Sequence, residues 1–474
     1  MRRIIMSLAT VTGLLTALLC APVSAQTGPV GRWEGRISIG PIVLTIAVVV
    51  SADGAGHTAT IDIPQQSAIG LALRNVSFEA GKAHFELPTG GAVAVFDGTL
   101  QGDAMAGTFE QGPARGTFDM KRAVPQAPAP PPPYRQEEVK YQSGAVTLAG
   151  TLTIPESKGP HPAVVMITGS GPQNRDEEIF GFRIFGVIAD YLTRHGIAVL
   201  RADDRGVGGS TGSTPQSTSA DFADDAQAAV KLLQARPDID RAHVGLMGHS
   251  EGGLIAPMVA ARTKDVAFII LMSGPGLTGE QIMLAQSELI GKAAGRTDEQ
   301  VKANQVIQRK LFAASRAGTG WDEAAAMIRA ELKAAFDAQP AAARASTPNP
   351  DQAIDAQVKA QLASVQTPWF RYFLDFDPAT VLEQVKCPVL ALFGEHDLQV
   401  PAAPNRAAME KAFAKGGLRK YRIEVFPRAN HLYQDSPTGG VAEYATLKKE
   451  FVPGFLDLVS SWILEQSGRK AQVK

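Results

Sequence analysis

Residues 248–252, Gly-His-Ser-Glu-Gly, lie between an apolar run at 244–247 and a helical stretch at 254–262. A serine at a sharp turn from strand to helix exposes its hydroxyl, and flanking glycines tolerate the strained backbone and close packing of such a turn. The N–H groups at the start of the helix point towards the place where an oxyanion develops. The pattern therefore predicts that Ser250 is a nucleophile, and the alternative interpretation is a structural glycine turn.

A base must take the proton from Ser250, because a serine hydroxyl is a poor nucleophile on its own. The chain has 8 histidines. His249 belongs to the motif but neighbours the serine and so faces the other way. His431 follows the last strand predicted after Ser250, at 422–426, and lies in Asn-His-Leu. We predict that His431 is the base, and the alternative is an ordinary surface histidine.

The third group should be a carboxylate that orients the histidine. The strand predicted at 389–393 lies between Ser250 and His431 in the chain and leads into Gly-Glu-His-Asp at 394–397. A carboxylate in that turn can accept a hydrogen bond from the far imidazole nitrogen and stabilise the imidazolium. Asp397 is the predicted acid, and Glu395 is the competing candidate.

The oxyanion hole needs two N–H donors, of which the residue after the nucleophile supplies one. The second should come from the end of an earlier strand. Residues 167–172, Ile-Thr-Gly-Ser-Gly-Pro, follow the first long buried strand. We predict the backbone N–H groups of Ser170 and Glu251, with Gly171 as the alternative to Ser170. A phosphate site is not favoured, because no Gly-Lys-Ser/Thr follows.

The rest of the chain after residue 135 alternates apolar strands with helical stretches. This rhythm predicts a mainly parallel central sheet with helices on both faces. The last helix is expected near 444–465. Between 273 and 378 no strand-like run occurs, and segments such as 281–294 have helical periodicity. We therefore predict a helical cap at about 277–376, whose aromatic cluster at 369–376 either lines the site or only joins the cap to the sheet.

The N-terminal part has a different organisation. Short apolar stretches separated by Gly, Asp and Asn turns predict a small antiparallel β domain at 29–122. Consecutive prolines then predict a semi-rigid linker at 123–134. The catalytic domain is expected at 135–470, including the cap.

The first 25 residues resemble a secretory signal peptide. Arg2 and Arg3 precede an apolar run, and Val-Ser-Ala at 23–25 provides the small residues of a cleavage site. A membrane anchor is the alternative, but the run is shorter than a spanning helix requires. We expect an exported protein, periplasmic or secreted, without stable membrane insertion after cleavage. Cleavage would leave Cys387 as the single cysteine, so no internal disulfide is expected.

Composition excludes several functional classes. Lys and Arg together number 46, and Asp and Glu together number 47. With the charges so nearly balanced, no strong positive electrostatic field favours binding to nucleic acid. The histidines and cysteines show no metal-ligand spacing, and we expect no metal and no cofactor. The expected partner is a small-molecule ester substrate, while the oligomeric state stays open.

Five motifs together resemble the α/β-hydrolase superfamily: Thr-Gly-Ser-Gly-Pro-Gln-Asn-Arg-Asp at 168–176, Asp-Asp-Arg-Gly-Val-Gly-Gly-Ser at 203–210, and the segments at 248–252, 394–397 and 430–431. Their order Ser…Asp…His is the one expected for that fold. Within it, the chain resembles bacterial carboxylesterases near the dienelactone-hydrolase and serine-aminopeptidase-like groups. Dienelactone hydrolases proper use cysteine where Ser250 stands.

The resemblance implies a serine hydrolase that cleaves carboxylic esters through an acyl-enzyme on Ser250. The alternative is an aminopeptidase or a dipeptidyl-peptidase-like serine peptidase, although the N-terminal propellers of such peptidases are several times longer than this β domain. A binding protein with a vestigial hydrolase domain is a third interpretation, which the complete triad disfavours.

Overall fold

The computed structural model describes residues 28–40, 42–54, 56–63, 68–88, 93–112, 114–123, 131–341, 344 and 349–469. The predicted signal peptide lies outside the described residues, as do residues 124–130 of the predicted linker. Within these ranges, no helix has the length and apolar character needed to cross a membrane.

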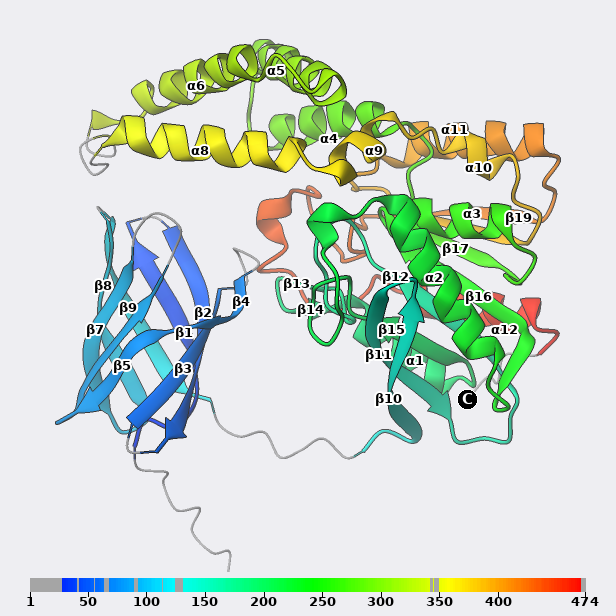
Figure 1. Cartoon of the computed structure of the whole chain (residues 1–474), viewed down its shortest axis with the longest axis horizontal. Coiled ribbons are helices and arrows are strands. Elements are labelled where there is room, and N and C mark those ends of the chain that lie inside the picture. The colour runs from blue at the N-terminus through cyan, green and yellow to red at the C-terminus, as the bar shows by residue number, and fades with distance from the viewer. Residues whose placement is uncertain are drawn as a thin grey trace, which may run out of the picture.

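The N-terminal strands form one antiparallel sheet that curves into a barrel-like domain (Figure 1). The sheet order is β4-β3-β2-β1-β9-β8-β7-β6-β5, and β3 also contacts β5, which brings the two ends together. Its interior holds Trp33, Phe85, Phe96 and Phe118, all almost fully buried. The strands are β1 (Gly31–Ile39), β2 (Ile42–Asp53), β3 (Gly56–Ile63), β4 (Ala68–Ala72), β5 (Arg74–Glu79), β6 (Lys82–Leu87), β7 (Ala94–Gln101), β8 (Ala104–Gln111) and β9 (Ala114–Arg122).

The second domain is built on an eight-stranded sheet of order β10-β11-β15-β12-β16-β17-β18-β19. The pairs from β15 to β19 are parallel, whereas β10, β11 and β15 pair antiparallel. The carboxyl ends of the parallel strands therefore meet at one edge, where sites in such sheets form. The strands are β10 (Tyr134–Ser143), β11 (Val146–Pro155), β12 (His161–Ile167), β15 (Ala198–Ala202), β16 (Ile239–His249), β17 (Ile269–Met272), β18 (Val389–Gly394) and β19 (Tyr421–Phe426), with a separate pair β13 (Glu178–Ile179) and β14 (Phe182–Arg183).

Helices cover both faces of this sheet, as predicted for the α/β-hydrolase fold. One apolar core joins the sheet to α1 and α12, and another joins it to α2, α3, α10 and α11. The bounds are α1 (Ile184–Arg194), α2 (Ser219–Gln234), α3 (Gly252–Arg262), α10 (Ala379–Leu382), α11 (Ala402–Gly416) and α12 (Phe455–Gln466), with 3₁₀ turns η2 (Thr214–Gln216) and η3 (Val441–Glu443).

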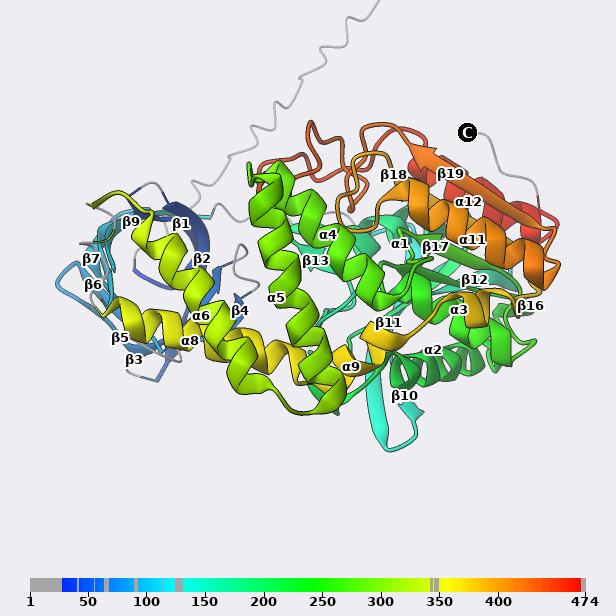
Figure 2. The same ribbon diagram turned by 90° about the horizontal axis from the view of Figure 1, so that it is seen from above.

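The predicted helical cap is present between β17 and β18. Its described helices are α4 (Gly279–Ala293), α5 (Asp298–Ala317), α6 (Trp321–Asp337), α8 (Pro350–Val365) and α9 (Pro368–Asp375). Thr278 and Thr297 start α4 and α5 with capping boxes, and Gly318 ends α5 in the left-handed region. Seen from above, α4, α5 and α9 lie over the α/β domain (Figure 2).

The last helix begins later than predicted. The sequence indicates a helix near 444–465, but α12 starts at Phe455. Pro453 disfavours the helical conformation in the residue before it. Gly454 precedes the helix with φ +81°, which separates α12 from the turn at η3. The apolar periodicity of 444–452 therefore reflects packing of an irregular segment.

Candidate active site

Ser250 lies at the turn between β16 and α3 with φ +52°, a conformation that non-glycine residues rarely adopt. Its N–H donates to the Met272 carbonyl oxygen over 2.8 Å, which ties the turn to β17. A Cβ added at Gly248 would lie 2.0 Å from the Gly252 oxygen, and one added at Gly252 would lie 2.1 Å from the Ile167 oxygen. The two flanking glycines are therefore required by close backbone packing around a strained serine.

His431 and Asp397 form a buried pair. Nδ1 of His431 lies 2.8 Å from Oδ2 of Asp397. The other carboxylate oxygen accepts the N–H groups of Gln399 and Val400, at 2.8 and 2.9 Å. Burial by itself would raise the pKa of Asp397, but the His431 ring and the hydrogen bonds lower that pKa below its ordinary value. An ionised Asp397 can therefore orient the imidazole and stabilise its protonated form.

The competing candidate, Glu395, lies elsewhere. Its side chain is 55% exposed, and Oε2 accepts the Arg428 N–H over 2.8 Å. Glu395 is therefore bound to the backbone of Arg428 at the solvent-exposed surface. The buried contact of His431 is made by Asp397 instead. The geometry thus favours Asp397 over Glu395 as the orienting acid.

Ser250 and His431 line one cavity of about 450 Å³ beneath the cap. Ser170 and Glu251 line it too, whereas Gly171 lines only a smaller cavity behind the loop. Among the backbone hydrogen bonds of the described residues, the N–H groups of Ser170 and Glu251 have no protein acceptor. The geometry therefore leaves these two donors available to an oxyanion, and favours Ser170 over Gly171.

The side chain of Glu251 makes buried contacts that the sequence did not indicate. Its Oε1 accepts the Ser219 hydroxyl at 2.6 Å and the Trp369 indole N–H at 2.8 Å. Burial raises the pKa of this carboxyl, although hydrogen bonds from these groups and from Ser170 partly oppose the shift. Glu251 thereby joins the nucleophile turn, the loop of Ser170 and helix α9 of the cap.

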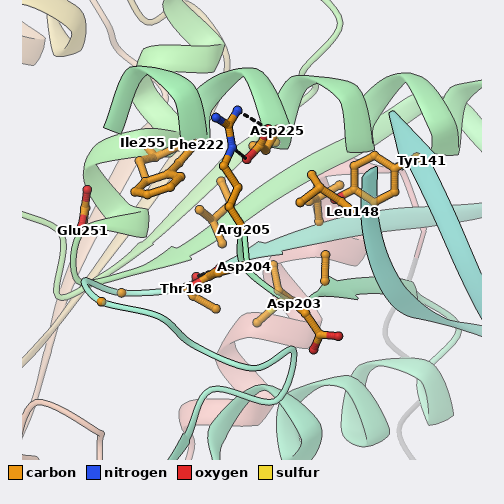
Figure 3. Close-up of a pocket in the computed structure, with 17 residues that line it drawn as sticks. Tyr141, Leu148, Thr168, Asp203, Asp204, Arg205, Phe222, Asp225, Glu251 and Ile255 are labelled. Atoms are coloured by element: carbon orange, nitrogen blue, oxygen red, sulfur yellow. Dashed lines mark hydrogen bonds and ion pairs between the residues drawn. The ribbon is translucent and has the colours of Figure 1, made fainter. Parts of the chain in front are cut away.

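A second cavity, of about 50 Å³, lies behind the Thr168–Gly171 loop (Figure 3). Asp204 reaches towards this loop, where it accepts the Thr168 hydroxyl at 2.7 Å and the Gln173 N–H at 2.8 Å. Arg205 turns the other way and pairs with Asp225 of α2 at 2.7 and 2.8 Å. The Asp204–Arg205 segment thus supports the loop from behind and anchors it to α2, without an ion pair between the two neighbours.

Asp204→Asn should change how stability depends on pH. Burial raises the pKa of Asp204 from 3.8 to about 8. The folded state then holds the proton that the unfolded state has lost, so between these values the carboxyl lowers stability as pH rises. Asparagine stays neutral and can still accept from Gln173 while donating to Thr168. We expect the variant to gain stability relative to wild type from pH 5 to pH 8, by up to about 1.4 kcal/mol per pH unit.

Urea unfolding of both proteins across this interval measures the difference. Parallel pH profiles for wild type and variant would show that Asp204 does not titrate in this way.

No group of three or more His, Cys, Asp or Glu side chains is placed to hold a metal ion in the part of the chain that the structure describes. The predicted set of Ser250, His431, Ser170 and Glu251 is gathered around one cavity, with Asp397 behind His431. Sequence patterns did not reveal the carboxyl groups of Glu251 and Glu177 or the ring of His249, which also line it.

Comparison with known proteins agrees with this architecture. The family described as serine aminopeptidase, S33, matches residues 182–434. The esterase EstD of Thermotoga maritima is 29% identical over 324 residues, which are 67% of this chain and 66% of that esterase. The match thus spans just under two thirds of this relative.

Solved structures are similar at lower identity. Proline iminopeptidase of Mycobacterium smegmatis has a TM-score of 0.42 and 20% identity over 70% of this chain and 98% of its own. An esterase of Pyrococcus furiosus has a TM-score of 0.43 and 16% identity over 73% of this chain and 95% of its own.

Proposed function

Within the serine aminopeptidase S33 family of α/β-hydrolases, to which this chain belongs, we propose that the protein is a carboxylesterase with Ser250 as nucleophile, His431 as base and Asp397 as orienting acid. The observation that carries the proposal is the buried 2.8 Å contact between His431 and Asp397, together with the cavity that His431 shares with the strained Ser250.

The reaction follows from these positions. Oγ of Ser250 attacks the ester carbonyl carbon while Nε2 of His431 takes the hydroxyl proton. The carbonyl oxygen becomes an oxyanion, which accepts the N–H groups of Ser170 and Glu251. The tetrahedral intermediate collapses, and the alcohol leaves with the proton from His431. Water then repeats the attack on the acyl-enzyme and releases the carboxylic acid.

The cavity favours a neutral, largely apolar substrate. Its apolar wall is made of Ile179, Phe180, Ile282, Met283, Trp369, Phe373, Val400, Leu432, Val441 and Tyr444. None of the described residues that line it is Lys or Arg, so no lysine or arginine there would pair with a carboxylate of the substrate. The likeness to EstD, which is named an esterase, supports the same substrate class.

An aminopeptidase is the second candidate, because the matching family is named for that activity. Such an enzyme must bind a substrate ammonium, which calls for an accessible carboxylate. The two acids that line the cavity, Glu177 and Glu251, are 0% and 2% exposed and are hydrogen-bonded to protein groups. This burial favours ester cleavage over aminopeptidase activity.

A substrate panel separates these functions. Purified wild type and Ser250→Ala are assayed on p-nitrophenyl esters of increasing acyl length and on aminoacyl and dipeptidyl anilides. We expect ester hydrolysis that disappears in Ser250→Ala and much slower anilide cleavage. Faster turnover of an anilide than of every ester would replace the esterase proposal with the peptidase one.

The aromatic cluster of the cap divides into two sets. Trp369 and Phe373 stack at 5.2 Å between ring centroids and line the cavity. Phe370 belongs to the interior of the cap, while Tyr372 and Phe376 pack on the core of the sheet. We therefore propose that Trp369 and Phe373 form a wall of the acyl pocket, and that the other three join the cap to itself and to the sheet.

Trp369→Ala and Phe373→Ala should change the ranking of short against long acyl esters. A pocket wall contributes differential binding of the transition state, worth about 1–3 kcal/mol for each methylene contact that is lost. The measurement is kcat/KM over a series of p-nitrophenyl esters from acetate upwards.

Phe370→Leu is the matched control, since this ring is buried in the cap away from the cavity. It should lower the melting temperature and leave the ranking unchanged. An unchanged ranking in stably folded Trp369→Ala and Phe373→Ala would assign the whole cluster to packing.

We also propose that the chain is exported, with cleavage after Ala25. The support is Arg2 and Arg3, the apolar run that follows, and Val-Ser-Ala at 23–25. N-terminal sequencing of the mature protein from a periplasmic or culture fraction checks this, and an intact Met1 in that fraction would contradict it.

A further inference from the structure

Glu177 is a buried acid that the triad does not use. It lies in the segment between β12 and β13, is fully buried, and has φ +45°. Its Oε1 accepts the Gly169 N–H at 2.7 Å and lies 2.9 Å from Nδ1 of His249. A non-glycine residue at positive φ is strained, and such strain persists where the surrounding structure holds it in place. Here the Glu177 carboxylate accepts the N–H of Gly169, the residue before Ser170.

His249 continues this chain of contacts. Its Nε2 lies 3.0 Å from the backbone oxygen of His431. An ionised Glu177 carboxylate and a backbone carbonyl oxygen both accept hydrogen bonds, and beside them both ring nitrogens donate, which makes the ring an imidazolium. Burial by itself would lower the pKa of His249, but the Glu177 carboxylate raises that pKa above its ordinary value.

The pair therefore spans the three segments that must be aligned for catalysis. Glu177 holds Gly169, the neighbour of Ser170. His249 is the neighbour of Ser250 and holds the backbone of His431. A misplacement of about 1 Å between such groups can cost about 10²-fold in rate.

We propose that Glu177 and His249 are a positioning pair, which as a buried ion pair fixes the distance between the oxyanion loop, the nucleophile turn and the base. The inference rests on the proposed serine-hydrolase function, but it assigns a function to two residues outside the triad.

The pair also lies against the ring of the base. The rings of His249 and His431 lie 4.7 Å apart, centroid to centroid. Loss of the pair should therefore lower kcat and leave KM little changed, because the base and the nucleophile would be misaligned while the walls of the cavity stay in place.

The test compares Glu177→Gln, His249→Gln and the double variant with wild type. The primary readout is the second-order rate constant for labelling Ser250 with a fluorophosphonate, because it does not depend on the natural substrate. The second is kcat and KM on p-nitrophenyl butyrate, per labelled site, across pH 5–9. His243→Gln is the control, because Nδ1 of His243 contacts Asp240 at 2.8 Å at the opposite end of β16.

We expect each single variant to lose about 10²-fold in labelling rate and in kcat with little change in KM. The double variant should lose no more than the worse single, because one chain of contacts is broken in both. His243→Gln should match wild type.

Glu177→Gln preserves the shape of the side chain, so it carries the test if His249→Gln fails to fold. Wild-type labelling and turnover in folded Glu177→Gln would overturn the positioning function while leaving the esterase proposal intact. Failure of the wild type itself to be labelled would overturn both, which distinguishes the two failures.

Discussion

Replacing Ser250 by alanine should abolish ester hydrolysis, and His431→Ala or Asp397→Asn should each lower kcat by at least about 10³-fold. Alanine at position 250 removes the nucleophile. Alanine at 431 removes the proton acceptor, and asparagine at 397 no longer stabilises the imidazolium at the 2.8 Å contact. The double variants should lose much less than the product of the single effects, because the three residues act as one unit.

Steady-state kinetics on a p-nitrophenyl ester measures these losses, with circular dichroism to verify folding. Glu395→Gln is the control for Asp397→Asn, because it changes an acid of the same turn that is 55% exposed. Near wild-type turnover in His431→Ala would show that the base has been misassigned. A large loss of kcat in Glu395→Gln would show that Glu395, and not Asp397, is the orienting acid.

Gly252→Ala should lower both stability and activity strongly. Helix propensity alone predicts the opposite, because alanine is favoured over glycine inside helices by about 1 kcal/mol. Here the new Cβ would lie 2.1 Å from the Ile167 carbonyl oxygen, at the end of β12. Backbone must move to relieve such a contact, at a cost of about 1–3 kcal/mol or more. The same movement would displace the loop of Ser170, so we expect a loss in kcat of about 10²-fold.

Urea denaturation and kcat on the same preparation check both parts of this expectation. Gly56→Ala in β3 is the matched control, because the nearest atom to its added Cβ is 3.8 Å away. The control should stay within about 0.5 kcal/mol of wild type. A Gly252→Ala protein that is more stable than wild type would mean that helix propensity, and not the backbone contact, determines the stability of the nucleophile turn.

Much of the catalytic domain was predictable because its signals are local. The apolar run, the glycines and the helix around Ser250 lie within about twenty residues, and they determine a strand, a turn and a helix whatever else surrounds them. The cap was predictable from about a hundred residues with helical periodicity and no strand. The hairpin of β10 and β11 was not predicted, because β10 alternates Glu, Lys, Gln and Arg at the sheet edge and lacks an apolar run.

The aromatic cluster of the cap shows the limit of such signals. Five aromatic residues lie close together in the chain, at positions 369, 370, 372, 373 and 376. Helix α9 directs Trp369 and Phe373 to the cavity and the others to two different cores. The identity of the residues predicted burial, while the direction in which the helix docks decided which of them meet the substrate.

The buried polar contacts depended on tertiary structure altogether. Glu251 meets Trp369 across 118 positions of the chain, Glu177 meets His249 across 72, and His249 meets His431 across 182. By itself, the sequence determined the fold, the nucleophile turn and the candidate triad, because periodicity and turn chemistry act between near neighbours. Only the folded chain decided which buried carboxyl meets which donor, because a hydrogen bond requires atoms within about 3 Å, and loops far apart in sequence reach that distance only when the sheet and cap have packed.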